Sequence, residues 1–276
     1  MDESEFRRWV RLLEERTGVV VPPERKQFLE TNLRLRMREL EIDTFADYYA
    51  QRLSGRKGAV EWAVLVDRLT VHQTHFFRHM PSLELVRDAV LPDFLMRRRR
   101  GAAFHAWSVG CSTGEEAYSL AMVIDRFCVQ ADQVFHYGIT ASDVSKAALD
   151  VGREGVYRRQ KLSEIPPDYR ERYCEPCNGD EFQISDRLLR RVGFAMLNML
   201  DISRQPLSHI DLIYCQNVMI YFPKDRRHQV LDQLVDCLGP GGYLILGPGE
   251  MTGWTHPQLI RVPGQRTLAY RRRPEE

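Results

Sequence analysis

Apolar side chains recur at helical spacing through the first part of the chain. Phe6, Val10 and Leu13 fall on one face of a predicted helix, and the same spacing of three or four positions continues in three later stretches. This pattern predicts a small all-α domain over residues 1–80. The predicted helices lie at about 6–13, 29–40, 45–53 and 60–69.

Beyond residue 100 the pattern changes. Short apolar runs of strand length alternate with amphipathic stretches of helical length. Such alternation predicts an α/β fold with a mostly parallel, doubly wound sheet and helices on both faces. The last two apolar runs predict a C-terminal antiparallel hairpin. We expect strands over 103–109, 134–141, 211–215 and 242–247, helices over 115–127, 145–151 and 223–238, and hairpin strands over 259–262 and 267–270.

The alternation is interrupted between about residues 156 and 197. Segments 182–184 and 188–197 are more typical of antiparallel strands than of a βα repeat. We therefore predict a small antiparallel β insertion within the second domain.

A run of four arginines, Arg97–Arg100, precedes Gly101. Like charges in a row repel one another, which predicts an exposed junction between domains. The expected division is a helical domain over 1–80, a linker over 81–100, and an α/β domain over 101–276 with its insertion at about 156–197.

Composition narrows the class of protein. The 276 residues include 39 Lys and Arg against 38 Asp and Glu, a formal net charge of +1. Nucleic-acid-binding proteins usually carry a basic excess, so we expect no nucleic-acid partner. The N-terminus, Met1–Glu5, lacks the features of a secretory signal. No apolar run approaches the roughly 18 residues that span a bilayer. We expect a cytoplasmic protein without membrane insertion; the sequence does not fix its oligomeric state, and a monomer is favoured.

The most informative stretch follows the first predicted strand of the second domain. Gly110 ends that strand, small residues form a turn, and a helix begins near Gly114. In doubly wound folds this turn lets a nucleotide-like ligand approach the backbone closely. The spacing G-x-x-x-G departs from the G-x-G-x-x-G dinucleotide fingerprint, which disfavours a nicotinamide enzyme. Glu116 is a candidate ligand contact, although Thr113 and Glu116 also form a possible capping box.

The second predicted strand ends in Ala141-Ser142-Asp143. An acidic residue at this position can accept hydrogen bonds from both hydroxyls of a bound ribose. Asp143 also precedes a predicted helix and suits an N-cap, a role compatible with the first. We favour the ribose role.

Four motifs occur in order along the chain: Thr74–Arg78, Ser112–Ser119, Ala141–Asp143 and Gln216–Phe222. Together they resemble the chemotaxis receptor glutamate methyltransferases, the CheR family, and the resemblance covers nearly the whole chain. The resemblance implies a class I, Rossmann-like methyltransferase domain that binds S-adenosylmethionine and releases S-adenosylhomocysteine. It also implies that the acceptor is a glutamate side chain in the cytoplasmic helical region of a chemoreceptor.

The same resemblance implies the site residues. Arg78 and Tyr221 would face the incoming carboxylate as catalytic residues. Glu116 would reach the methionine or ribose part of the cofactor, and Asn198 and Met199 would lie around the adenine. The cofactor-binding residues are expected to be His72, Thr74, Arg78, Gly110, Glu116, Asp143, Asn198, Met199, Gln216 and Asn217.

Three positions depart from the usual family pattern. His72 stands where well-known members carry an asparagine, and Gln216 replaces the arginine of the R-N-V-M-I-Y-F motif. Residues 247–250, Gly-Pro-Gly-Glu, replace a common Gly-His-Ser-Glu ending. Two alternatives therefore stay open: a signalling scaffold that binds the cofactor with impaired catalysis, and a methyltransferase on another protein acceptor.

The implied chemistry requires positioning more than acid–base catalysis. An unperturbed glutamate titrates near 4.3, so the acceptor is already a carboxylate at neutral pH. In-line placement of oxygen, methyl carbon and sulfur then supplies most of the acceleration. Arg78 can hold the carboxylate through planar donors, and Tyr221 can add an O–H donor. The alternatives are that Arg78 pairs with Asp143 or Glu116 and that Tyr221 only packs.

No metal is expected. Cys174 and Cys177 form one C-x-x-C pair, and a zinc site usually needs a second pair of ligands. His72, His75 and His79 would share one face of a helix, yet methyl transfer to an ionised carboxylate has no use for a Lewis acid.

The second predicted helix is rich in basic residues interleaved with acidic ones. A solvated face laced with ion pairs is the simpler interpretation, and a surface for an acidic receptor helix is the alternative. The basic residues are Arg25, Lys26, Arg34, Arg36 and Arg38.

Overall fold

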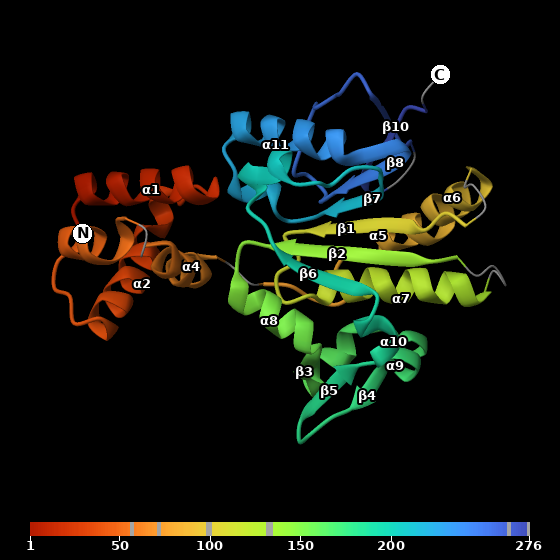
Figure 1. Ribbon diagram of the computed structural model, residues 1–276, viewed down its shortest axis with the longest axis horizontal. Helices are drawn as coiled ribbons and strands as arrows, with labels where there is room; N and C mark the ends of the chain where they lie inside the picture. Colours follow the sequence, from red (N-terminus) through yellow and green to blue (C-terminus); the bar gives the residue numbers. More distant parts are fainter. Residues whose placement is uncertain (56–57, 71–72, 98–100, 131–134, 264–265, 275–276) are drawn as a thin grey trace.

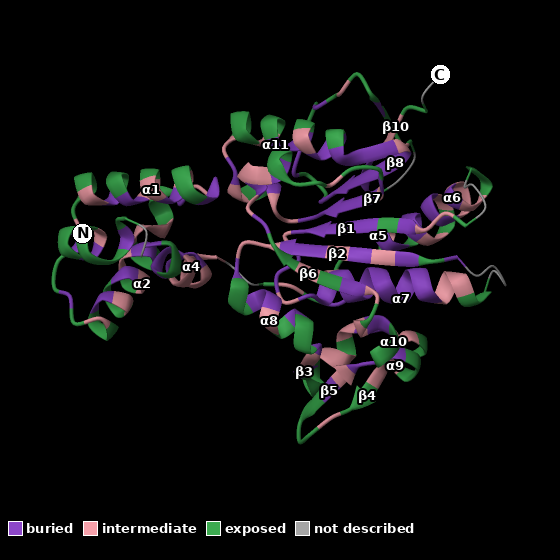
Figure 2. Ribbon diagram, in the orientation of Figure 1, coloured by how far each residue is buried: buried purple, intermediate pink, exposed green. Residues whose placement is uncertain are grey.

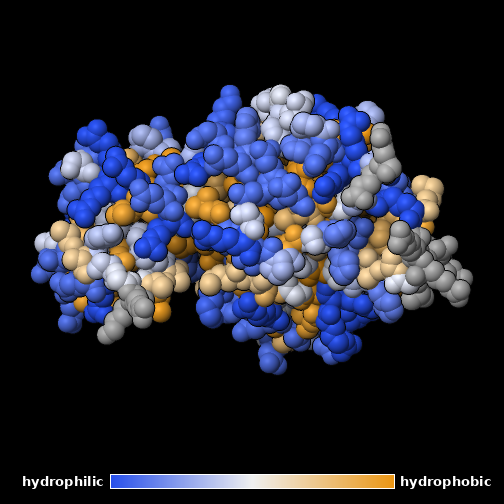
Figure 3. All heavy atoms as spheres, turned by 45° about the horizontal axis from the view of Figure 1, so that its top comes forward, coloured by the Kyte–Doolittle hydropathy of each residue, from blue (hydrophilic) through white to orange (hydrophobic). Residues whose placement is uncertain are grey.

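The computed structural model describes residues 1–55, 58–70, 73–97, 101–130, 135–263 and 266–274. In Figure 1 a helical lobe that contains the N-terminus stands beside a larger α/β body. Among the described residues, no helix is both long enough and apolar enough to cross a bilayer. On the face drawn in Figure 3 most side chains are hydrophilic, with apolar ones in separate groups between them.

The N-terminal lobe is helical, as the apolar spacing predicts. Its first helix begins with a capping box between Asp2 and Glu5 and ends where Gly18 adopts a left-handed φ of 74°. Trp9 stacks on Tyr48 in the buried centre of the lobe. The elements are α1 (Glu3–Thr17), η1 (Pro23–Arg25), α2 (Lys26–Glu39), α3 (Phe45–Tyr48), η2 (Tyr49–Leu53) and α4 (Gly58–Leu69).

Most of the stretch expected to be a linker, residues 81–100, is helical in its described part. Val86, Val90 and Phe94 recur at helical spacing and are buried in the core of the α/β body. This burial stabilises helices that the arginine run had led us to overlook. The elements are α5 (Met80–Leu85), η3 (Val86–Val90) and α6 (Leu91–Arg97).

A seven-stranded sheet forms the centre of the α/β body, and its mostly parallel arrangement agrees with the prediction. The first five strands in the sheet order are parallel, and the last two, the predicted C-terminal hairpin, are antiparallel. Figure 2 shows the middle strands buried between helices. The order is β6 (Val192–Met196), β2 (Tyr137–Asp143), β1 (Phe104–Val109), β7 (Ile210–Cys215), β8 (Leu238–Leu246), β10 (Leu268–Arg272) and β9 (Leu259–Arg261).

Helices cover both faces of this sheet. Alternate residues of β1 enter different cores: Ala106 packs on the side of α5 to α8, and Trp107 packs on the side of α11. The parallel strands therefore end together at one edge, where their connecting loops meet. The covering helices are α7 (Glu115–Gln130), α8 (Lys146–Glu154) and α11 (Lys224–Cys237).

The insertion contains a three-stranded antiparallel sheet in the order β3-β5-β4. One part of the prediction was wrong: segment 188–197 is not an antiparallel strand of this sheet. Its strand β6 pairs in parallel with β2 at the edge of the main sheet, Ile139 opposite Val192. The elements of the insertion are β3 (Val156–Arg158), η4 (Arg159–Glu164), α9 (Pro167–Tyr173), β4 (Cys174–Pro176), β5 (Glu181–Ile184) and α10 (Asp186–Leu189).

Candidate functional site

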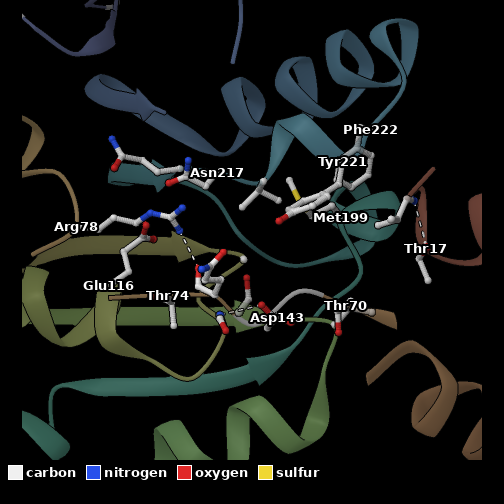
Figure 4. A pocket seen from close by; sticks show the side chains of 18 of the residues that line it. Thr17, Thr70, Thr74, Arg78, Glu116, Asp143, Met199, Asn217, Tyr221 and Phe222 are labelled. Carbon is white, nitrogen blue, oxygen red and sulfur yellow. Dashed lines mark hydrogen bonds between the residues drawn. The ribbon is translucent and has the colours of Figure 1, made fainter. Parts of the chain in front are cut away.

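A large cavity opens at the carboxyl edge of the main sheet, with about 1370 Å³ of empty space that includes open solvent. The loops that follow β1, β2, β6 and β7 form its floor, and the α1–α2 connection of the N-terminal lobe forms one wall. Figure 4 shows polar side chains from these loops pointing into the space. A ligand here lies between the two parts of the chain.

The structure brings the expected site residues together. All but one of them line this cavity, although they come from segments up to about 150 residues apart. His72 lies outside the described residues. The expected residues on the cavity wall are Thr74, Arg78, Gly110, Glu116, Asp143, Asn198, Met199, Gln216, Asn217 and Tyr221.

Gly110 makes the turn after β1. It has a φ of 71°, and a Cβ atom added there would stand 2.5 Å from Cγ2 of Val218. Its backbone N–H donates to the carbonyl oxygen of Ser142 at 2.8 Å, which ties this turn to the end of β2. Only glycine adopts this φ easily and also avoids the clash with Val218. Glycine here therefore allows the turn backbone to lie directly at the cavity.

Glu116 does not form the capping box that the sequence allowed. Ser108 on β1 donates its hydroxyl hydrogen to Oε1 of Glu116 at 2.6 Å, whereas Thr113 donates to Glu115. Burial raises the pKa of Glu116 to about 8; the Ser108 hydrogen bond and the charge of Arg78 oppose that rise. Figure 4 shows the carboxyl group beneath the Arg78 guanidinium. Glu116 is thus a half-buried acid on the cavity floor, largely protonated at neutral pH.

Asp143 connects two turns at the cavity edge. Its Oδ2 accepts the backbone N–H of Ser112, and its Oδ1 accepts that of Ser145, each at 2.9 Å. The N-cap of α8 is Ser145, whose side chain accepts from Ala148 N–H, so Asp143 is not the cap. A carboxylate has about four acceptor sites, so Asp143 can still accept hydrogen bonds from ribose hydroxyls.

Arg78 is exposed at the cavity mouth, in the loop between α4 and α5. Its Nη1 donates to the carbonyl oxygen of Gln73 at 2.9 Å. His75 and His79 do not share a helical face, because this segment is a turn and each ring has its own partner. Among the residues that the structure describes, no three His, Cys, Asp or Glu side chains are grouped to hold a metal ion.

The turn after β7 carries Asn217 and Tyr221. Asn217 has a φ of 61°, and the Tyr221 hydroxyl points into the cavity in Figure 4. Gln216 is buried, and its Nε2 donates to Ser82 Oγ at 2.7 Å and to the Leu246 carbonyl oxygen at 3.2 Å. The Gln216 side chain therefore joins the turn to α5 and β8.

Glu250 supports this turn, a role that the sequence did not reveal. Its carboxyl group accepts the backbone N–H of Met219 at 3.0 Å and that of Gly247 at 2.6 Å. Burial raises the pKa of Glu250, and these backbone hydrogen bonds oppose the rise. The available signal was a lone acidic residue in the loop after a buried strand.

The N-terminal lobe supplies cavity residues that the sequence also did not reveal. Thr17, Val19 and Val20 line the cavity. Nδ2 of Asn198 donates to the carbonyl oxygen of Arg16 at 2.6 Å. The backbone N–H of Val20 donates to the carbonyl oxygen of Tyr221 at 3.0 Å. The two parts of the chain are therefore hydrogen-bonded to each other beside the expected adenine site.

The chemistry of the wall suits a nucleoside that also carries positive charge. Ser112 Oγ is buried and, among the described residues, has no hydrogen-bond partner. Asp143 offers acceptors for sugar hydroxyls, and Glu116, once ionised, offers a carboxylate to a cation. Leu197 and Met199 give an apolar surface for a base. These groups fit a ligand made of base, ribose and a cationic side chain.

Comparison with known proteins agrees with this geometry. Residues 72–267 match the family model "CheR methyltransferase, SAM binding domain", and residues 4–70 match "CheR methyltransferase, all-alpha domain". The chain is 30% identical over 269 residues to chemotaxis protein methyltransferase 1 of Vibrio cholerae, with 96% of each chain covered. The Escherichia coli K12 chemotaxis protein methyltransferase is 30% identical, covering 91% of this chain and 85% of that one. The Borreliella burgdorferi protein is 27% identical, covering 97% and 92%.

Proposed function

Because this chain belongs to the CheR methyltransferase family, we propose that it methylates glutamate side chains of chemoreceptors, giving methyl esters in sensory adaptation. Its cofactor is S-adenosylmethionine. The observation that carries the proposal is the one cavity that Arg78, Glu116, Asp143 and Tyr221 line together.

Within this proposal the carboxylates hold the cofactor. Asp143 accepts hydrogen bonds from the ribose hydroxyls, and Glu116, once ionised, pairs with the positive charge of the methionine part. Gly110 keeps the turn backbone close to the ligand, and Met199 packs on the adenine. Bound S-adenosylmethionine supplies a methyl group activated by a sulfonium.

The acceptor side belongs to Arg78 and Tyr221. The guanidinium is exposed at the cavity mouth, where an incoming carboxylate meets planar N–H donors. The Tyr221 hydroxyl faces the same space from the opposite wall. A grip that is too strong would stabilise the ground state, so one arginine and one phenol suit a reaction in which charge is lost.

The scaffold alternative receives no support from Gln216. Its side chain makes two hydrogen bonds to neighbouring elements, and Gln216 lines the cavity as expected. The Gly-Pro-Gly-Glu loop likewise keeps a working carboxylate, because Glu250 holds the Asn217 turn. We therefore propose an active enzyme.

We further propose that the helical domain, residues 1–80, binds the receptor, and that the enzyme acts in the cytoplasm. Ion pairs within this domain reduce the number of basic residues that are free to bind a receptor. Lys26 pairs with Glu3, Arg34 with Glu30, and Arg36 with Glu39 and Glu61. Arg38, which is exposed, and Arg25, which lines the cavity, are better placed than these paired residues to meet acidic residues of a receptor helix.

The test is incubation of the purified protein with methyl-labelled S-adenosylmethionine and receptor-bearing membranes, followed by alkali. We expect label on the receptor that base releases as methanol, since methyl esters are base-labile. Receptor whose acceptor glutamates are changed to alanine is the control. Label that resists alkali would indicate that the methyl group is not on a carboxyl ester. Absence of label would favour the alternative of a signalling scaffold with impaired catalysis.

A further inference from the structure

The insertion touches the loop that carries Arg78. Glu164, the last residue of η4, accepts the backbone N–H of Phe76 through Oε2 at 2.9 Å. Its Oε1 lies 3.1 Å from Nδ1 of His75. One carboxyl group of the insertion thus holds two consecutive residues of the Thr74–Arg78 loop.

The same short segment also grips the second cofactor motif. Lys161 forms an ion pair with Glu115, whose side chain is 1% exposed, and its Nζ lies 3.5 Å from the carbonyl oxygen of Thr74. Tyr157 on β3 donates its hydroxyl hydrogen to the carbonyl oxygen of Thr113 at 2.7 Å. These bonds join the loop after α4 to the turn before α7.

Aromatic packing strengthens the connection. The ring of Phe76 meets the edge of the Tyr157 ring at a centroid distance of 5.0 Å and lies 6.1 Å from that of Phe182 on β5. Both Phe76 and Tyr157 are buried. The loop is therefore fastened by polar bonds at its backbone and by an apolar contact at its side chain.

This loop needs external support, because it is neither helix nor strand and part of it is strained. Phe77 has a φ of 51°, a region that bulky residues rarely adopt. Such a conformation persists when its surroundings over-determine it. The Phe77 N–H donates to Ser119 Oγ at 2.9 Å, and the Phe76 N–H donates to the insertion. Thr74 and Arg78 flank these two fixed residues.

We propose that Tyr157, Lys161 and Glu164 of the insertion form a clasp that positions the Thr74–Arg78 loop for methyl transfer. The inference rests on the proposed function and deepens it. Glu164 is a positioning residue: it acts on the acceptor through the loop backbone and Arg78. The insertion is then part of the catalytic unit, and a change in it alters the rate of transfer.

The central variant is Glu164→Ala, compared with Glu164→Gln and with Glu171→Ala. Glu171 is an exposed glutamate on α9 of the same insertion and serves as the matched control. The glutamine variant keeps one carbonyl oxygen that can accept the Phe76 N–H. Circular dichroism and thermal unfolding establish that each variant is folded.

We expect Glu164→Ala to lower kcat about tenfold or more, because small displacements of positioning groups cost up to about a hundredfold in rate. Glu164→Gln recovers part of the loss, and Glu171→Ala stays within about twofold of the unaltered protein, as expected for an exposed side chain. Hydrogen exchange of the peptide covering residues 74–78 accelerates in Glu164→Ala and not in Glu171→Ala.

Several results would overturn the clasp: an unchanged kcat in Glu164→Ala, a glutamine variant no faster than the alanine variant, or a slower enzyme whose 74–78 peptide exchanges as before. The exchange measurement needs no receptor. If the unaltered protein transfers no methyl group to receptors, the proposed function fails, and the exchange data still decide whether the insertion holds the loop.

Discussion

We predict that cofactor binding releases a proton, because Glu116 must ionise to pair with the positively charged ligand. Burial raises the pKa of this carboxyl to about 8 in the free protein, against an ordinary value of 4.5. At pH 7 the group is then mostly protonated. A ligand that places a cation beside it favours the carboxylate, so we expect most of one proton to be released for each molecule bound at pH 7.

The same linkage sets the pH dependence of affinity. Below the pKa, each unit of pH is expected to tighten binding about tenfold, since a proton must leave; above about 8 the affinity levels off. The assay is calorimetry with S-adenosylhomocysteine, which keeps the ammonium group, at pH 6 to 9. Buffers with different ionisation enthalpies report the number of protons released.

Glu116→Gln removes the titrating group while keeping a similar shape. We expect weaker binding that no longer varies with pH between 6 and 8, and heats that no longer depend on the buffer. The exposed Glu154 provides the control, and Glu154→Gln should behave as the unaltered protein. Buffer-independent heats in the unaltered protein at pH 7 would refute the reasoning.

Stability should follow the same carboxyl group. Between pH 4.5 and about 8 the folded protein retains a proton that the unfolded chain has lost. The contribution of Glu116 to stability is therefore fully present below pH 4.5 and is lost as the pH rises towards 8. Glu250, whose pKa burial also raises, adds a slope of the same sign. Urea unfolding across this range should show a shallower pH dependence for Glu116→Gln than for the unaltered protein.

Three further predictions address other parts of the cavity. Asp143→Ala should weaken S-adenosylhomocysteine binding about 10- to 100-fold by calorimetry, because hydrogen bonds to a charged group are lost; unchanged binding would remove the ribose role. Arg78→Ala should lower the rate of labelled methyl transfer about 100-fold while the unfolding midpoint stays within a few degrees, and normal turnover would exclude it as the carboxylate anchor. Gly18→Ala should destabilise the protein by about 1–3 kcal/mol in urea, because its Cβ would stand 2.5 Å from the Phe222 ring; an unchanged midpoint would contradict the packing.

Local pattern was sufficient for much of the fold. Strand and helix periods differ, so the alternation after residue 100 identified the strands and helices of the main sheet within a few residues. The strand β6 was assigned wrongly, because its partner, β2, lies some 50 residues earlier. Its short run, Val192–Met196, holds one buried residue. The sequence pattern of such a run does not distinguish an edge strand of the main sheet from a strand of a separate hairpin.

The helices α5 and α6 were missed for another reason. The charge run at Arg97–Arg100 suggested exposure, and that suggestion was extended too far towards the N-terminus. Buried Leu83, Val86 and Val90 carry a helical period that the same reasoning would have detected. Here local information was present in the sequence and was outweighed by a neighbouring signal.

Residues that would contact the ligands can be predicted from the sequence, whereas residues that hold the surrounding turns in place cannot. Motifs locate residues such as Arg78, but carboxyl groups hold the turns in place: Glu164 binds Phe76 N–H from 88 positions away, and Glu250 binds Met219 N–H from 31 positions away. A carboxyl group satisfies several backbone donors in any turn that comes within reach, so the contact demands no particular residue type from its partner. Such a bond leaves no periodicity and no motif at the turn. It follows that a sequence can resemble an enzyme in every contact residue and still differ in rate, because the groups that fix those contacts are free to change elsewhere in the chain.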